Sequence, residues 1–188
     1  MKVIFLDHDG VICLSTEWGG RFKKQTKVGR KLSQSVLSLP VDARFDNFNK
    51  KAIKILNKIL EETGAEIVVS SDWKRWATVE EMGEYYEAQG IIKKPIAFTD
   101  SILSNNYEDF PWDSYQLEPE QTRSLEIAEY LTNFPSITKW VAIDDLDMSI
   151  RKKSGEYSWG LSNFVITPKS NEGIKQSGIK EKILTFLK

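Results

Sequence analysis

Two carboxylates near the start of the chain have a spacing that suits nucleophilic and acid–base chemistry. Asp7 and Asp9 come directly after the apolar run 3–6. One carboxylate of such a pair can attack phosphorus, and the other can protonate a leaving oxygen and later deprotonate water. Gly10 follows and lets the backbone turn sharply. Taken alone, the Asp-x-Asp-Gly pattern is also typical of an acidic turn or a calcium-binding loop.

A second pair of acids, Asp144 and Asp145, ends another apolar run. Adjacent acids at the end of a buried strand are unfavourable unless a cation lies among them. If Asp7 and Asp9 lie nearby, four carboxylates share one site, and Mg²⁺ with its preference for oxygen ligands would relieve their repulsion. Asp145 or Asp147 could instead cap a following helix, although capping does not need the pair.

Hydroxyl groups and cations complete the set of candidate residues. Ser70 and Ser71 end a third apolar run, where a hydroxyl could hold a phosphoryl oxygen or cap the next helix. A phosphorus transition state also needs a fixed cation besides the metal. Arg123 begins the helix before the fourth strand and so should point toward the same end of the sheet, and Lys74 and Lys139 are competing candidates.

The elements that must position these side chains alternate along the chain. Apolar runs predict strands at 3–6, 66–71, 95–100, 140–145 and 163–168. Helical periodicity predicts helices at 49–63, 73–89, 120–131 and 178–187. In the third helix, Leu125, Ala128 and Leu131 share one face, which we expect to be its apolar face. The alternation predicts a parallel sheet covered on both sides, with functional residues at the carboxyl ends of the strands.

Composition limits the chemistry further. The 188 residues suffice for one domain, and the net charge of -1 gives no support to sequence-independent nucleic-acid binding. Cys13 is the single cysteine and His8 the single histidine, which excludes a cysteine-built zinc site and any site of several imidazoles. The first apolar run is too short for a signal peptide or a membrane span, so we expect a soluble, cytoplasmic protein.

Two stretches, 13–48 and 101–119, do not fit the alternation. Long connections without regular structure are uncommon in compact domains unless they are functional. The first contains the basic segment 21–31, with six Lys or Arg in eleven residues beside Trp18 and Phe22. Charges next to aromatic rings suit a nucleic-acid strand, but a solvated loop would have the same composition.

In this order, the motifs resemble the haloacid dehalogenase (HAD) superfamily of phosphatases over nearly the whole chain. The first motif of that superfamily is matched by residues 3–11, the second by 67–70 and the fourth by 141–145. Finer features resemble the small HAD domains of RNA-repair proteins. Residues 70–74, Ser-Ser-Asp-Trp-Lys, are similar to Ser-Ser-x-Trp-Arg, and residues 122–127 are similar to Arg-Gly-x-Glu-Ile. Lys74 and Ser124 depart from the usual Arg and Gly.

This resemblance implies a Rossmann-like sheet of about five strands in the order 5-4-1-2-3, with a minimal cap for which 13–48 would be a flap. It implies Asp7 as nucleophile and Asp9 as general acid and base. Mg²⁺ would be bound by Asp7, by the backbone carbonyl of Asp9 and chiefly by Asp145, with Asp144 in support. The expected catalytic residues are Asp7, Asp9, Ser70 and Arg123, and the expected substrate-binding residues are Ser70, Ser71, Lys74 and Gly10.

We therefore expect a Mg²⁺-dependent phosphatase that works through an aspartyl-phosphate. The acid at Asp9 favours phosphohydrolases, because dehalogenases lack it. Little room for a cap suggests an open site for a large phosphorylated substrate, such as a nucleic-acid end, a nucleotide or a protein. Two alternatives are a non-catalytic relative that binds in the same crevice and a phosphotransferase, although phosphotransferases usually need a cap to exclude water. No membrane and no obligate protein partner is expected.

Overall fold

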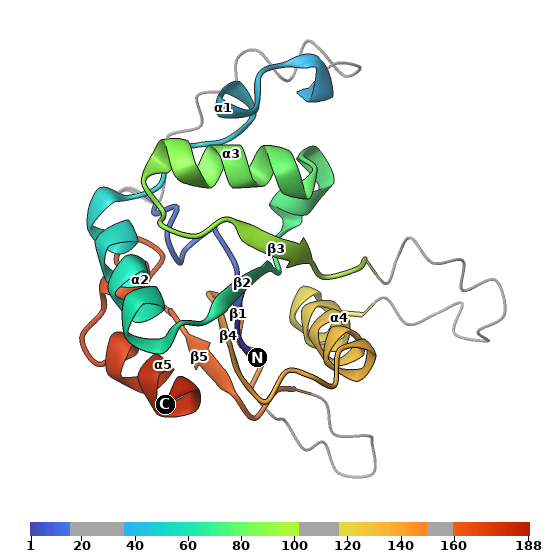
Figure 1. Ribbon diagram of the computed structural model, residues 1–188, viewed down its shortest axis with the longest axis vertical. Helices are drawn as coiled ribbons and strands as arrows, with labels where there is room; N and C mark the ends of the chain where they lie inside the picture. The colour runs from blue at the N-terminus through green and yellow to red at the C-terminus, as the bar shows by residue number, and fades with distance from the viewer. Residues whose placement is uncertain (16–35, 102–116, 150–159) are drawn as a thin grey trace, which may run out of the picture.

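The computed structural model describes residues 1–15, 36–101, 117–149 and 160–188, and these build a five-stranded sheet with helices on its faces (Figure 1). The strands are β1 Lys2–Leu6, β2 Glu66–Val69, β3 Pro95–Phe98, β4 Lys139–Asp144 and β5 Phe164–Ile166. All neighbouring strands pair in parallel, in the order β3-β2-β1-β4-β5. This order is the predicted one counted from the opposite edge, so the predicted fold class is confirmed.

The central strand β1 is buried on both faces, which explains its unbroken apolar run. Ile4 and Leu6 belong to one core, whereas Val3 and Phe5 belong to another. Since side chains alternate along a strand, these two cores lie on opposite sides of the sheet.

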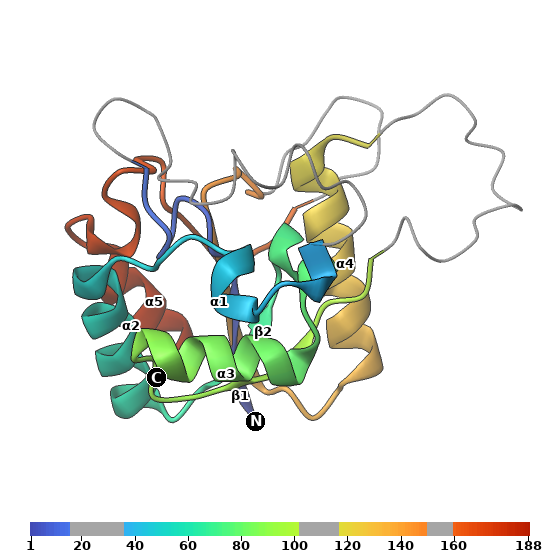
Figure 2. The same cartoon turned by 90° about the horizontal axis from the view of Figure 1, so that it is seen from above.

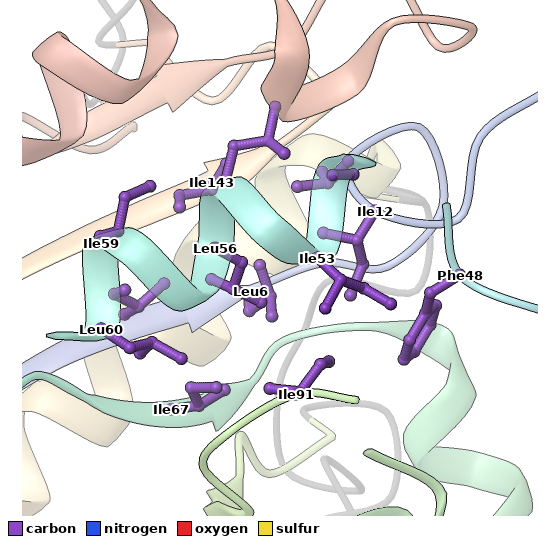
Figure 3. Close-up of a cluster of buried hydrophobic side chains, with 14 of the residues drawn as sticks. Leu6, Ile12, Phe48, Ile53, Leu56, Ile59, Leu60, Ile67, Ile91 and Ile143 are labelled. Atoms are coloured by element: carbon purple, nitrogen blue, oxygen red, sulfur yellow. The ribbon is translucent and has the colours of Figure 1, made fainter. Parts of the chain in front are cut away.

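In the described part of the chain, the long helices on the Ile4 and Leu6 face are α2 Lys50–Thr63, α3 Val79–Gln89 and α5 Ile179–Leu187. Figure 3 shows the stripe that α2 presents to the sheet, made of Ile53, Leu56, Ile59 and Leu60. The helix begins where the Asn49 side chain accepts hydrogen bonds from the N–H groups of Lys51 and Ala52. It ends at Gly64, whose φ of 68° only glycine adopts readily. The predicted helix 49–63 is thus confirmed.

Among the described residues, one helix, α4 Pro119–Asn133, covers the other face (Figure 1). It packs Ile127 and Tyr130 against the sheet, and the ring of Tyr130 meets Phe5 edge to face at 5.6 Å. The expectation that Leu125, Ala128 and Leu131 form the apolar face of this helix is wrong: Leu125 is 41% exposed, Ala128 is exposed and Leu131 is half-buried. The buried face instead includes three polar residues, Arg123, Ser124 and Glu126. Their burial has a reason in the site described below.

The predicted helix 73–89 is interrupted. A short 3₁₀ helix, η2 Asp72–Trp76, comes first, and Ala77 and Thr78 are extended before α3 begins. Thr78 and Glu81 form a reciprocal capping box, in which each side chain accepts a hydrogen bond from the other residue's backbone N–H. That cap fixes a new helix start, so the apolar periodicity alone overestimated the helix.

The segment 36–48, which closes the first irregular stretch, packs onto the domain. It holds the short helices η1 Val36–Ser38 and α1 Val41–Arg44. The buried guanidinium of Arg44 donates to both carboxylate oxygens of Glu81, at 2.7 and 2.8 Å, and to the carbonyls of Leu37, Leu39 and Trp76. Residues 16–35, including the basic segment 21–31, and residues 102–116 lie outside the described part, so the flap over 13–48 stays a prediction.

The corrected face of α4 can be tested by two substitutions on the same helix. Ile127→Ala removes a fully buried side chain and should lower the free energy of unfolding by about 2–5 kcal/mol. Leu125→Ala, the control, should change it by less than about 0.5 kcal/mol because the side chain already meets solvent. Urea unfolding of both variants measures this difference. An equal loss of unfolding free energy in the two variants would support the apolar face expected from the sequence.

Candidate active site

The register of the sheet brings three chain-distant residues together. Leu6 pairs with Val69 on one side and with Ile143 on the other. The next residues along these strands are Asp7, Ser70 and Asp144, and all three are buried. Figure 2 shows the ends of β1 and β4 on the same side of the molecule as the first turn of α4. The carboxyl ends of the strands therefore bring together three of the residues that the sequence proposes for a site.

Three carboxylates gather there. Oxygen atoms of Asp7, Asp144 and Asp145 all lie within 4.8 Å of one another, and the first two side chains are buried. Gly10 makes this crowding possible. Its φ is 71°, and a Cβ at this position would lie 2.2 Å from Oδ2 of Asp145. The glycine thus allows the loop after β1 to pass directly beside the Asp145 carboxylate.

Arg123 is the cation that faces these acids. Its Nη1 donates to Oδ1 of Asp7 at 3.1 Å and to Oδ2 of Asp144 at 3.0 Å, and it also donates to the carbonyl of Ser70. Burial alone would lower the pKa of the guanidinium, but the Asp144 and Asp7 carboxylates hold it above its ordinary value. This contact explains why Arg123 is buried on α4: the helix places its guanidinium against the carboxylates.

The other two cation candidates, Lys74 and Lys139, contact other groups than these acids. The ammonium of Lys74, predicted to bind substrate, makes a buried ion pair of 2.6 Å with Glu126 and donates to Oγ1 of Thr99 at 3.1 Å. Burial lowers the pKa of Lys74, and Glu126 opposes that shift. Lys139 begins β4, paired with Lys2 at the opposite end of the sheet. Sequence reasoning assigned no role to Glu126, although it belongs to the motif that selected Arg123.

Burial shifts the pKa values of two of the three acids upward. Burial raises the pKa of Asp7 to about 6, although Arg123 and a hydrogen bond from Ser71 oppose the shift. Burial, reinforced by the Asp7 charge, raises the pKa of Asp144 well above its ordinary range. Among the described residues, three carboxylates and one guanidinium gather in this poorly solvated place, which leaves negative charge in excess. An all-oxygen donor set with that excess fits a hard divalent cation such as Mg²⁺.

Ser70 offers a buried hydroxyl with an unused hydrogen bond. Its Oγ is shielded from solvent and has no hydrogen-bond partner among the residues that the structure describes. Ser71 stands at the N-cap position of η2, but its side chain makes no capping hydrogen bond and instead bonds to Asp7. Because buried hydroxyls are normally satisfied, the Ser70 group is suited to a ligand oxygen.

Asp9 lies in different surroundings from Asp7. Its Oδ2 accepts a hydrogen bond of 3.2 Å from the indole Nε1 of Trp73, and its carboxylate does not belong to the three-acid cluster. In the described part of the chain, Asp7 thus accepts a hydrogen bond from a guanidinium, and Asp9 accepts one from a neutral indole N–H.

Thr167, which follows β5, supports the site and was missed by sequence reasoning. Its hydroxyl donates to the carbonyl of Gly10 at 3.1 Å, and its N–H donates to the carbonyl of Asp144 at 2.9 Å. It thereby joins the loops that carry the two acidic motifs. The only available signal was its place at the end of a predicted strand.

His8 lies between the two acids in the chain but points into the core. Its Nε2 is 2.6 Å from the hydroxyl of Tyr86, and its ring contacts Trp73 and Phe48. Burial, reinforced by the charge of Arg123, lowers the pKa of His8 to about 3. The imidazole is therefore neutral at physiological pH and is part of the packing under the site.

The strand order and the acids at the ends of β1 and β4 define a HAD-like α/β domain. A comparison with protein families matches residues 3–179 to the HAD domain in Swiss Army Knife RNA repair proteins, and the chain belongs to this family. The resemblance inferred from the motifs is thereby confirmed. Comparisons with curated proteins and with solved structures gave no match. None of the helices in the described ranges is long and apolar enough to cross a membrane.

The burial of His8 predicts how the free energy of unfolding depends on pH. The folded protein keeps His8 neutral down to about pH 3, whereas the ordinary pKa is 6.5, so the unfolded chain binds more protons between these values. The free energy of unfolding contributed by His8 should fall as the pH drops through that window, by up to about 1.4 kcal/mol per pH unit.

Urea unfolding of the native protein and of His8→Phe at pH 7.5, 6.0 and 5.0 isolates this contribution. The native protein should lose stability relative to the variant as the pH falls. Tyr86→Phe serves as control, because it removes the hydrogen bond to His8 and keeps the titrating ring. A difference between native protein and His8→Phe that stays constant with pH would contradict the prediction.

Proposed function

We propose that this protein is a Mg²⁺-dependent phosphohydrolase that cleaves phosphomonoesters through an aspartyl-phosphate on Asp7. The observation that carries the proposal is the Asp7 carboxylate itself. It lies at the end of a buried strand and is paired with Arg123, and Ser70 at the end of the neighbouring strand β2 has a buried hydroxyl with no hydrogen-bond partner among the described residues. This combination offers a nucleophile, a fixed positive charge and a donor for a phosphoryl oxygen in one place.

In this reaction Asp7 attacks the phosphorus atom while the ester P–O bond breaks. Asp9 gives its proton to the leaving oxygen. Asp9 then takes a proton from water as that water attacks the same phosphorus, and the bond to Asp7 breaks to release inorganic phosphate. Arg123 balances charge on the nucleophile and on the phosphoryl oxygens, and Ser70 donates to one of those oxygens.

Asp7, Asp145 and the backbone carbonyl of Asp9 would hold the metal ion. When bound, Mg²⁺ would supply positive charge that screens the nucleophile from the phosphoryl oxygens. Asp144 suits a supporting role, because its two oxygens already accept from Arg123 and from the N–H of Leu146. A carboxylate with both oxygens engaged orients its neighbours and has less to offer an ion directly.

A nucleotide or a phosphorylated nucleic-acid end is the substrate that we propose. The support comes from the family, whose members are described as HAD domains of RNA repair proteins. A binding protein without catalysis is disfavoured because the acids, the serine and the arginine of the site are all present. A phosphotransferase would need a device that excludes water from the aspartyl-phosphate.

A panel of phosphomonoesters tests the proposal. We expect Mg²⁺-dependent release of phosphate from an aryl phosphate and from oligonucleotides with 5′- or 3′-phosphates. Asp7→Asn should reduce kcat at least about a thousandfold, since an amide is a poor nucleophile towards phosphorus. Hydrolysis by purified Asp7→Asn at the native rate, or no turnover of any substrate by the native protein, would refute the proposed mechanism.

A metal titration distinguishes the roles of the two adjacent acids. Asp145→Asn should raise the Mg²⁺ concentration for half-maximal activity by more than about tenfold, because it weakens a direct ligand. Asp144→Asn should raise this concentration less and should mainly lower kcat, because it loosens Arg123. Calorimetry of Mg²⁺ binding should give the same order. The reverse order in both measurements would mean that the two roles are exchanged.

A further inference from the structure

We propose that Trp73 is a positioning residue for Asp9, and that its indole N–H holds the carboxyl group in the orientation that proton transfer to the leaving group requires. This inference rests on the proposed phosphohydrolase function and assigns a task to the tryptophan of the Ser-Ser-Asp-Trp-Lys motif. The contact that carries it is the hydrogen bond of 3.2 Å from Nε1 of Trp73 to Oδ2 of Asp9.

The indole can fix a carboxyl group only if the ring itself cannot move, and it is tightly held. Phe45 stacks on it at 4.6 Å with an angle of 3° between the rings, and Phe48 stacks at 5.5 Å with an angle of 17°. The His8 ring lies 4.7 Å away. Trp73 is only 8% exposed. Aromatic pairs at these distances add to the stability of the packing, so the N–H has a fixed direction.

The aromatic cluster is anchored in turn to the helices beside it. The hydroxyl of Tyr85 donates to the carbonyl of Asp46 at 2.7 Å, and the N–H of Phe48 donates to the Gln89 side chain at 3.0 Å. These bonds tie the segment that contains Phe45 and Phe48 to α3. The indole is therefore held between the segment after α1 and the helix α3, independently of the acid that it contacts.

The chemistry of the donor suits a group that must gain and lose a proton. Over one turnover, Asp9 is a carboxylic acid before it releases its proton and a carboxylate afterwards. A neutral N–H can donate to a carbonyl oxygen of the acid and to an oxygen of the carboxylate alike.

The test is Trp73→Phe, which keeps an aromatic ring and removes the N–H. Two substrates are compared: a nitrophenyl phosphate, whose leaving group needs little protonation, and a nucleoside 5′-phosphate, whose leaving group needs much. The loss in kcat should be at least about tenfold greater for the nucleotide than for the nitrophenyl ester, which corresponds to about one hydrogen bond. KM should change little for either substrate.

Two further variants separate positioning from packing. Phe48→Leu disturbs the same cluster without removing the N–H and should lower both rates in the same proportion. In an Asp9→Asn background, Trp73→Phe should add no further selective loss for the nucleotide, because the two residues act in one step. An equal loss for both substrates in Trp73→Phe, or an undiminished selective loss in the Asp9→Asn background, would overturn the inference.

A measurement without turnover tests the contact itself. The indole N–H of Trp73, assigned in the NMR spectrum by its absence from Trp73→Phe, should exchange with solvent faster in Asp9→Ala than in the native protein. An unchanged exchange rate would show that the hydrogen bond is absent, whatever the activity. If the native protein hydrolyses neither ester, the proposed function fails together with this role, whereas an active native protein with an unselective Trp73→Phe refutes the role of Trp73 alone.

Discussion

Negative charge confined in a small buried space is the constraint on which the rest of this structure depends. Asp7, Asp144 and Asp145 approach within 4.8 Å of one another at the carboxyl ends of β1 and β4, where burial already disfavours ionisation. A buried charge is tolerated only with partners of opposite sign and satisfied hydrogen bonds. Arg123 supplies one such partner, and the charge that remains is what a divalent cation would neutralise.

Several features of the fold follow from that requirement. The helix α4 buries polar side chains because it must bring Arg123 to the acids, and Glu126, about one turn further along this helix, forms a buried ion pair with Lys74 of η2. Only glycine fits at position 10, because the Asp145 carboxylate occupies the space that a Cβ would need. The aromatic cluster under the site includes Trp73, which contacts Asp9 directly. The packing and the site are thus parts of one arrangement.

The sequence predicted the parts of this arrangement that leave a local signal. Apolar runs located all five strands, and the parallel register then brought Asp7, Ser70 and Asp144 together. The apolar face of α4 was mispredicted because Leu125 and Ala128 follow helical spacing while the site demands that Arg123 and Glu126 face inward. Contacts such as Thr167 to Gly10 and Trp73 to Asp9 join residues far apart in the chain, and no local sequence pattern predicts such pairs.

In the proposed reaction Asp7 becomes covalently phosphorylated, and acid-quenched mass spectrometry can detect that phosphoryl group. Asp9→Asn is mixed with an aryl phosphate and Mg²⁺, quenched within the first turnovers and digested. Asp9 is needed to activate the water that attacks the intermediate, so its loss should let the intermediate accumulate. We expect one phosphoryl group on the peptide that contains Asp7 in the Asp9→Asn variant. We expect none on that peptide in Asp7→Asn. Release of phosphate without any protein-bound phosphoryl group, or a phosphoryl group on another residue, would contradict it.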